Sequence, residues 1–201
     1  MSRSVPIFLV LEGLDGAGKT TIAQRVAEVL GAVYMTTPCP QVRGYREELL
    51  RAFGGCQEAA QLLYLATVFA ASAAAREQLA SGRSVVLDRY FLSTQAYAEF
   101  RGSSLRLDSL QQHLKPADLT VYVEASLDVR RSRVARRSGN NSADRETLTP
   151  DADLRLRAAY AARFRSPVVG HLLTLDTTIA PIEEAVARVV ATARTNLAGS
   201  D

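Results

Sequence analysis

The most chemically specific stretch of the chain runs from Gly13 to Thr20 and reads Gly-Leu-Asp-Gly-Ala-Gly-Lys-Thr. It fits the pattern G-x-x-x-x-G-K-[ST] at every fixed position. Glycines at these places let backbone N–H groups turn onto phosphate oxygens, and Lys19 reaches the terminal phosphates. The hydroxyl of Thr20 is the expected Mg²⁺ ligand. The pattern predicts a nucleoside triphosphate site, and it assigns to that site Gly13, Asp15, Gly16, Ala17, Gly18, Lys19, Thr20 and Thr21.

The segments on either side of this loop support the same interpretation. Residues 7–11 form a short apolar run of the kind found in strands, and residues 21–30 carry apolar side chains at helical spacing. Strand, glycine loop and helix therefore follow one another in the required order. This context argues against a glycine turn that binds nothing.

The rest of the chain alternates in the same way between apolar runs and helical patterns. Further strands are expected at residues 32–36, 84–87, 119–123 and 171–175, and helices at 43–53, 57–81, 91–100, 105–114, 127–137, 152–164 and 182–193. Such alternation is typical of a parallel sheet with helices on both faces. We therefore expect an α/β fold of the P-loop NTPase type, with a five-stranded parallel sheet and a single domain over residues 1–201.

Composition narrows the class of protein without identifying it. The chain has 201 residues, 47% of them hydrophobic and 22% charged, with a net charge of +3. Cys39 and Cys56 fit neither a disulfide framework nor a zinc site, which favours a reducing compartment. Residues 1–6 lack the layout of a signal peptide, and the apolar window at 59–75 is expected to be a core helix and not a membrane span. We expect a cytoplasmic protein.

Three longer motifs resemble those of thymidylate kinase. They are residues 8–21, the triplet Asp88-Arg89-Tyr90 with residues 92–97 after it, and residues 115–123. They occur in the family's order and spacing over nearly the whole chain. The resemblance implies a kinase that uses ATP and Mg²⁺ and acts on a nucleotide.

The resemblance also implies roles for individual residues around the acceptor. Asp15 would hold the 3′-hydroxyl of its deoxyribose, although a carboxylate that tunes the loop is an alternative. Arg89 would bridge the acceptor phosphate and the transferred group, although an ion pair with Asp88 is an alternative. Asp88 would bind Mg²⁺ through water. Tyr97 would lie under the sugar and disfavour a 2′-hydroxyl, and Thr94 would face the base edge; both could instead be packing residues.

A basic run at residues 130–137 leads into a polar segment that corresponds to the family's lid, at about 138–149. Because position 16 is glycine here, this chain resembles members whose lid supplies an arginine, so Arg137 and Arg145 are candidates to bind ATP. A solvated helix face and a nucleic-acid patch are the alternatives for this run. Residues 176–178 fall where family members line the adenine pocket.

Two family features are missing. After the second strand, members carry an Arg-Glu-Pro type motif, whereas residues 36–40 read Thr-Thr-Pro-Cys-Pro. Arg43 or Arg46 could replace the lost charge. In the long helix, Tyr64 stands at the position of the aromatic residue that stacks on thymine, and Val68 at that of the arginine that reads the base. We therefore expect Val68→Arg to raise the preference for thymidylate.

Together these observations predict ATP-dependent phosphoryl transfer to a deoxynucleoside monophosphate, foremost dTMP, with Lys19, Arg89 and Asp15 at the reacting groups. A monophosphate acceptor is already largely ionised at neutral pH and needs no strong general base. The alternatives are a kinase of this scaffold with another nucleotide, a nucleoside or a small hydroxyl compound as acceptor, and a nucleotide-binding module without turnover. The resemblance also implies a homodimer, for which the apolar long helix is a plausible interface.

Overall fold

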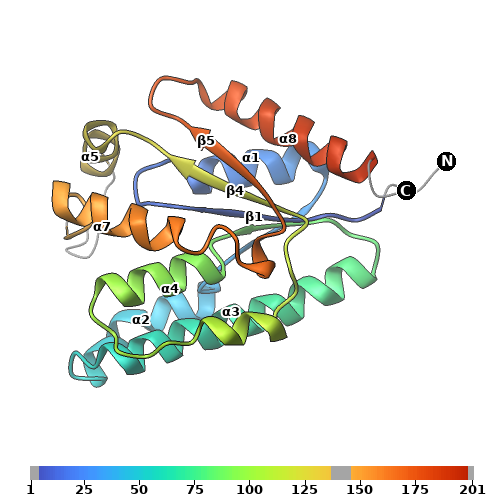
Figure 1. The fold of residues 1–201 in the computed structure, drawn as a ribbon. Helices are drawn as coiled ribbons and strands as arrows, with labels where there is room; N and C mark the ends of the chain where they lie inside the picture. The colour runs from blue at the N-terminus through green and yellow to red at the C-terminus, as the bar shows by residue number, and fades with distance from the viewer. Residues whose placement is uncertain (1–4, 137–145, 199–201) are drawn as a thin grey trace.

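The computed structural model describes residues 5–136 and 146–198, and its centre is a five-stranded, all-parallel sheet in the order β2-β3-β1-β4-β5 (Figure 1). This confirms the predicted α/β fold. The strands are β1 (Phe8–Gly13), β2 (Val33–Thr36), β3 (Val85–Asp88), β4 (Leu119–Glu124) and β5 (His171–Asp176). The helices are α1 (Lys19–Leu30), α2 (Pro40–Ala52), α3 (Gln57–Ala80), α4 (Phe91–Phe100), α5 (Leu127–Ala135), α7 (Pro150–Ala161) and α8 (Ile182–Ala198), with 3-10 helices η1 (Asp108–His113) and η2 (Pro167–Val169).

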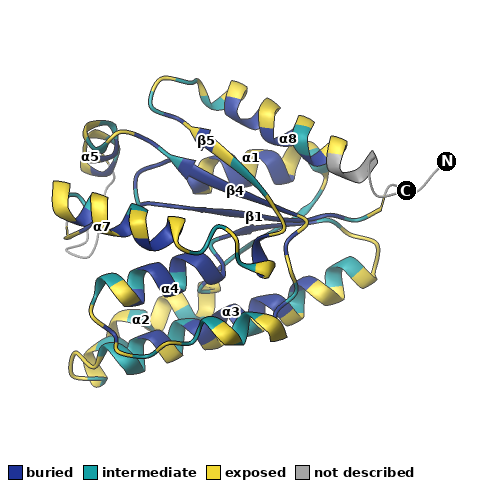
Figure 2. Ribbon diagram, in the orientation of Figure 1, coloured by how far each residue is buried: buried dark blue, intermediate teal, exposed yellow. Residues whose placement is uncertain are grey.

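The central strand β1 explains why the first apolar run is continuous and not alternating. All six of its residues are buried, because helices cover the sheet on both sides. Phe8 and Val10 pack on one face with the cores of α3, α4 and α7, while Leu9 and Leu11 pack on the other with α1 and α8. Figure 2 shows β1 and β4 in the colour of buried residues between these two helical layers. The sheet therefore separates two hydrophobic clusters.

The long helix α3, predicted to be a core helix, is buried on one side only. Leu65, Val68 and Ala75 face the sheet and are buried, whereas Leu62 on the other side is 50% exposed. The helix thus covers the sheet and presents its opposite side to the surface (Figure 2). By length and hydropathy α3 would also suit a membrane span, but such a single helix is weak support for one, and here it forms part of the core.

Two other elements differ from the sequence predictions. The helix expected at residues 105–114 is only the short 3-10 helix η1. Helix α2 begins at Pro40, three residues earlier than predicted, because proline suits the first turn of a helix, where its missing N–H is not needed. The predicted lid, about 138–149, lies mostly outside the described residues.

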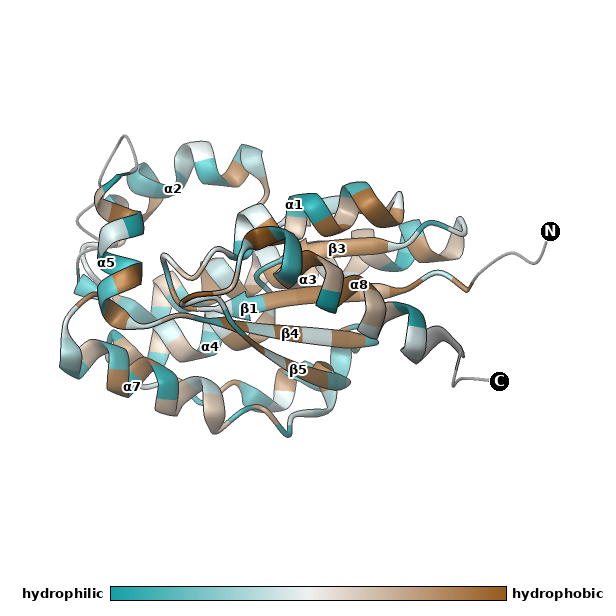
Figure 3. Cartoon of the chain, turned by 90° about the horizontal axis from the view of Figure 1, so that it is seen from above, coloured by the Kyte–Doolittle hydropathy of each residue, from teal (hydrophilic) through white to brown (hydrophobic). Residues whose placement is uncertain are grey.

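Parallel strands end at one edge of the sheet, and the predicted site residues gather there. Gly13, Thr36, Asp88 and Glu124 close four of the strands at this edge. Figure 3 shows hydrophobic colour concentrated in the strands, with more hydrophilic residues on α2 and α5 near that edge. A crevice at the carboxyl edge is where ligands bind in open α/β sheets.

Candidate active site

The glycine loop lies tightly between β4 and α5, and two of its glycines are required by packing. A Cβ added at Gly13 would stand 2.0 Å from the carbonyl oxygen of Val123, and one at Gly16 would stand 2.8 Å from that of Arg130. Both glycines have positive φ, as does Gly18, the residue that precedes α1. The first N–H groups of a helix have no partner within it, so this loop and α1 together offer donors to phosphate.

Lys19 opens α1 and is nearly fully buried beneath the loop. Its Nζ donates a hydrogen bond of 2.6 Å to the carbonyl of Leu14. Burial, with a smaller contribution from the nearby charge of Arg89, lowers the pKa of Lys19 to about 7. The carboxylates of Asp15, Asp88 and Glu12 offset this burial only in part, and a polyphosphate would supply further negative charge.

Thr20 and Asp88 lie together at the ends of the loop and of β3. The Thr20 hydroxyl donates to Asp88 Oδ2 at 2.6 Å, and the Tyr34 hydroxyl approaches the same oxygen at 3.5 Å. Asp88 Oδ1 is buried and has no hydrogen-bond partner among the described residues. A hydroxyl beside a carboxylate with a spare buried oxygen is the hard oxygen donor set that Mg²⁺ prefers, so these residues fit the ion.

Arg89 points toward the glycine loop, where it forms an ion pair with Asp15. Its partner is thus not Asp88, the alternative considered from the sequence. Tyr97 donates a hydrogen bond of 2.7 Å to the other Asp15 oxygen, and the guanidinium carbon lies 5.4 Å from the centre of the Tyr97 ring. Burial alone would raise the pKa of Asp15, but the charges of Arg89 and Lys19 hold it well below its ordinary value.

The backbone around Arg89 is held in an uncommon conformation, with a φ of 70°. The Arg89 N–H donates to Leu11 at 2.9 Å, and its carbonyl accepts from the hydroxyl of Thr37 at 2.8 Å. One residue on, the N–H of Tyr90 donates to the carboxylate of Glu12 at 3.1 Å. The conformation is thus determined from three sides, which fixes where the guanidinium can reach.

Glu12 and Thr37 both hold the turn at Arg89 in place, a function that the sequence patterns do not reveal. Glu12 is fully buried and accepts from the N–H and hydroxyl of Ser93 as well as from Tyr90. Burial raises its pKa against the effect of these hydrogen bonds. Since its oxygens cap the start of α4, Glu12 holds the Arg89 turn and does not line the acceptor cavity. An acid at the end of a fully buried strand is the signal that could have marked it.

A cavity of about 330 Å³ adjoins this cluster and extends between α2, α3 and α4. It brings together all five residues predicted to bind the acceptor: Asp15, Tyr64, Arg89, Thr94 and Tyr97. Thr20 and Asp88 line its other end. A compartment for a second reactant therefore lies directly beside the loop that would hold the triphosphate.

Comparison with known proteins identifies the family of the chain. The family model for thymidylate kinase matches residues 11–189. The chain belongs to the thymidylate kinase family. A probable thymidylate kinase of Staphylothermus marinus is 33% identical over 80% of this chain and 82% of that protein, and the thymidylate kinase of Ruegeria pomeroyi is 28% identical over 90% of this chain and 94% of that protein. The solved thymidylate kinase of Candida albicans shares the fold, with a TM-score of 0.74 and 20% identity over 95% of this chain and 92% of that one.

The thymidylate kinase resemblance places Val68 where a base-reading arginine would stand, and in the structure this valine belongs to the core. Val68 is fully buried in the cluster between α3 and the sheet and does not line the cavity. Tyr64, one turn earlier, does line it. An arginine at position 68 would have to be accommodated in this hydrophobic core, which argues against the predicted gain in thymidylate preference from Val68→Arg.

The cavity is lined by Arg43 and Arg46 of α2, the two candidates to replace the charge of the family's missing motif. Arg46 Nε donates to the Tyr64 hydroxyl at 2.7 Å. Arg43 donates to the Thr36 hydroxyl at 2.6 Å, near the end of β2. The cavity thus retains positive charge on the side where the Arg-Glu-Pro type motif is absent.

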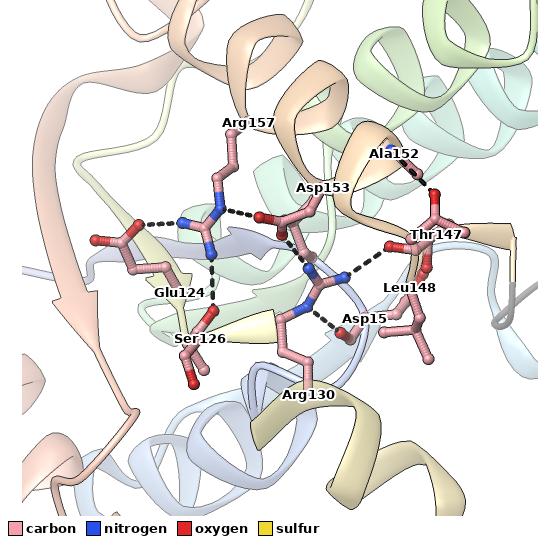
Figure 4. A network of polar contacts seen from close by, with 12 residues as sticks. Asp15, Glu124, Ser126, Arg130, Thr147, Leu148, Ala152, Asp153 and Arg157 are labelled. Atoms are coloured by element: carbon pink, nitrogen blue, oxygen red, sulfur yellow. Dashed lines mark hydrogen bonds and ion pairs between the residues drawn. The ribbon is translucent and has the colours of Figure 1, made fainter. Parts of the chain in front are cut away.

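The basic run of α5 is not only a solvated helix face. Arg130 is fully buried and donates from Nε to the carbonyl of Asp15 at 2.7 Å, as Figure 4 shows. It also pairs with Asp153, which in turn accepts from Arg157, and Arg157 reaches Glu124 at 2.7 Å. This network ties the glycine loop to α7 and to the end of β4.

Arg133, one turn after Arg130, joins the glycine loop to the segment after β5. It donates to the carbonyl of Thr177 at 2.7 Å, and the Thr177 hydroxyl donates to Ala17 at 2.8 Å. Residues 176–178, predicted to lie at the adenine pocket, are thus held against the loop. Arg137 and Arg145, the predicted lid arginines, lie outside the described residues.

Proposed function

We propose that this protein, a single kinase domain, transfers the γ-phosphoryl group of ATP to the 5′-phosphate of dTMP, forming dTDP and ADP. The observation that carries the proposal is the position of Arg89 between the glycine loop and the cavity, paired with Asp15 and packed on Tyr97. From there its guanidinium can contact both the transferred group and the acceptor phosphate. Phosphoryl transfer needs mainly this positioning and charge neutralisation.

The other residues act on the two substrates from opposite sides. Lys19 and the loop N–H groups would bind the terminal phosphates of ATP. Thr20 and Asp88 would hold Mg²⁺, which neutralises charge on the phosphate oxygens. On the acceptor side, Asp15 would accept a hydrogen bond from the 3′-hydroxyl, and Tyr97 would exclude a 2′-hydroxyl.

The test is release of ADP by the purified protein with ATP and Mg²⁺ and a panel of nucleoside monophosphates and nucleosides. We expect dTMP to give the highest kcat/KM and thymidine to give none. Stimulation by a nucleoside but by no monophosphate would establish the alternative of a hydroxyl kinase. ATP binding without stimulation by any acceptor would establish a binding module.

We also propose that the protein is a cytoplasmic homodimer whose interface includes α3. The exposed side of α3 carries Leu62, and α2 beside it carries Tyr45, which is 65% exposed. These two large apolar side chains are the exposed ones that we assign to the interface. The exposed free thiols of Cys39 and Cys56 suit a reducing compartment.

A further inference from the structure

The wall of the cavity between α3 and α4 contains a buried carboxamide that no motif indicates. Gln61 is 3% exposed, lines the cavity, and lies one helical turn before Tyr64 on α3. Polar side chains this deeply buried require fixed hydrogen-bond partners. The partners of Gln61 therefore determine what it can offer to a ligand.

Gln61 is anchored at both ends of its amide group. Its Nε2 donates to Gln95 Oε1 of α4 at 2.8 Å, and its Oε1 accepts from the hydroxyl of Ser103. An amide nitrogen carries two hydrogens, and no second acceptor for Gln61 Nε2 is present among the described residues. The side chain is thus held in place with one donor to spare.

The same network contains an unpaired buried group. Gln95 is 2% exposed, and its Nε2 has no hydrogen-bond partner in the part of the chain that the structure describes. Unpaired buried donors are uncommon in native proteins, and they commonly mark the place of a water molecule or a ligand. Of this pair, Gln61 is the residue that lines the cavity, so it is the one placed to meet a polar partner there.

Thr94, on helix α4, offers the cavity a hydrogen-bond acceptor, whereas Gln61 offers a donor. Its hydroxyl donates to the carbonyl of Tyr90 at 3.1 Å, so its oxygen can only accept from a molecule in the cavity. The wall thus presents one donor and one acceptor. The O4 carbonyl and N3–H of thymine complement this pair, whereas cytosine has the reverse pattern, an amino group and an accepting N3.

We propose that Gln61 determines base specificity by donating a hydrogen bond to the O4 carbonyl of the acceptor's pyrimidine, with Gln95 and Ser103 as its positioning residues. The inference rests on the proposed function, since it assumes a pyrimidine nucleotide in this cavity. Gln61 would supply the base contact that Val68 cannot supply, because an aliphatic side chain has no hydrogen-bond donor and Val68 is packed in the core.

The test compares Gln61→Glu with Gln57→Glu. A glutamate at position 61 can still accept from Ser103, and the Gln95 amide can turn its free nitrogen toward it, so the network survives while the donor to the base is lost. Gln57 lines the same cavity one turn earlier, but its Nε2 already donates a hydrogen bond to the carbonyl of Gly55 at 3.1 Å. It is a matched control that adds the same charge without removing a base contact.

We expect Gln61→Glu to lower the ratio of kcat/KM for dTMP to that for dCMP about tenfold or more. The KM for ATP should stay the same, and Gln57→Glu should keep the wild-type ratio. The ratio cancels the effect of the added charge, which acts on both anionic acceptors. A wild-type ratio in Gln61→Glu, or an equal change in Gln57→Glu, would overturn the proposal.

Calorimetric binding of dTMP and dCMP separates this inference from the proposed function, because it does not depend on turnover. If the Gln61→Glu protein does not fold, the binding comparison uses the neutral variant Gln61→Met, whose side chain is similar in length to the native one. We expect it to lose affinity for dTMP and not for dCMP. Equal losses, or equal binding of both nucleotides by the wild type, would refute the role of Gln61 even in an active kinase. Failure of the wild type to release ADP with dTMP would refute the proposed function instead.

Discussion

At the residue scale, the site depends on one guanidinium held in a defined place. Arg89 has a left-handed backbone, and hydrogen bonds from Thr37 and to Leu11 hold that backbone from both sides. Asp15 then orients the side chain toward the glycine loop. Preorganised charge of this kind stabilises a transition state more effectively than a mobile side chain, because no reorganisation is needed during the reaction.

We predict that Arg89→Ala lowers kcat about a hundredfold or more, with little change in the KM for ATP. Lysine at this position should restore little, because it lacks the planar fork that contacts two oxygens together. Steady-state kinetics with dTMP would measure both variants. Arg25→Ala, which removes an exposed arginine of α1, is the control that should behave like wild type. A near-normal kcat in Arg89→Ala would refute the assigned role.

A second residue-scale prediction follows from Lys19, whose pKa is lowered from the ordinary 10.5 to about 7. At pH 8 the amine is mostly neutral in the ligand-free protein. Phosphate favours the charged form, so binding of ATP raises the pKa and takes up a proton. Calorimetry at pH 8 in buffers of different ionisation enthalpy should show an uptake approaching one proton.

At pH 6, Lys19 is already charged, so its contribution to proton uptake should vanish. The same depressed pKa means that the unfolded chain binds more protons than the folded one between about pH 7 and pH 10. The contribution of Lys19 to the stability of the ligand-free protein therefore increases as pH rises through this window. Binding at pH 8 with no proton uptake would contradict the account of Lys19.

At the element scale, the packing of α3 decides which of its residues can face a ligand. Alanine supplies much of this helix, so its apolar residues do not mark a single face. In the structure Leu65 and Val68 face the sheet, while Gln61 and Tyr64 line the cavity. Because Gln61 and Val68 are seven residues apart, they lie on nearly the same side of the helix, so its two functions, binding wall and core, are divided mainly along its length.

We predict that Val68→Arg destabilises the protein by about 3 kcal/mol or more, because it places an unpaired charge in the hydrophobic core. Urea unfolding followed by circular dichroism would measure the change. Glu77→Arg, at an exposed position of the same helix, should alter stability by no more than about 0.5 kcal/mol. A stable Val68→Arg protein with improved use of dTMP would show that position 68 faces the base after all.

At the scale of the whole molecule, the exposed side of α3 with Leu62 does not line the cavity, so it is available for association. If it forms the proposed dimer interface, light scattering should give a mass near twice the 21.8 kDa of the chain. Leu62→Glu should then produce monomers, because it places a charge in the apolar contact. Leu154→Glu, on the 70% exposed leucine of α7, is the matched control and should remain dimeric. A monomeric wild type would refute the interface.

The sequence by itself determined the features that depend on neighbours along the chain. The order strand, glycine loop and helix around Lys19 is local, and so is the alternation that implied a five-stranded parallel sheet. Parallel strands place their carboxyl ends at one edge, and this is why Asp15, Asp88 and Arg89 could be grouped without coordinates.

Only the tertiary structure decided which side chains meet across that edge and which are buried. It paired Arg89 with Asp15 and not with its neighbour Asp88, buried Arg130 within a run that resembled a solvated face, and turned Val68 into the core. The physical reason is that these outcomes depend on contacts between elements distant in sequence. A charge is stable in the interior only where such contacts provide partners, and helical periodicity cannot select a face when alanine and other apolar residues surround the helix.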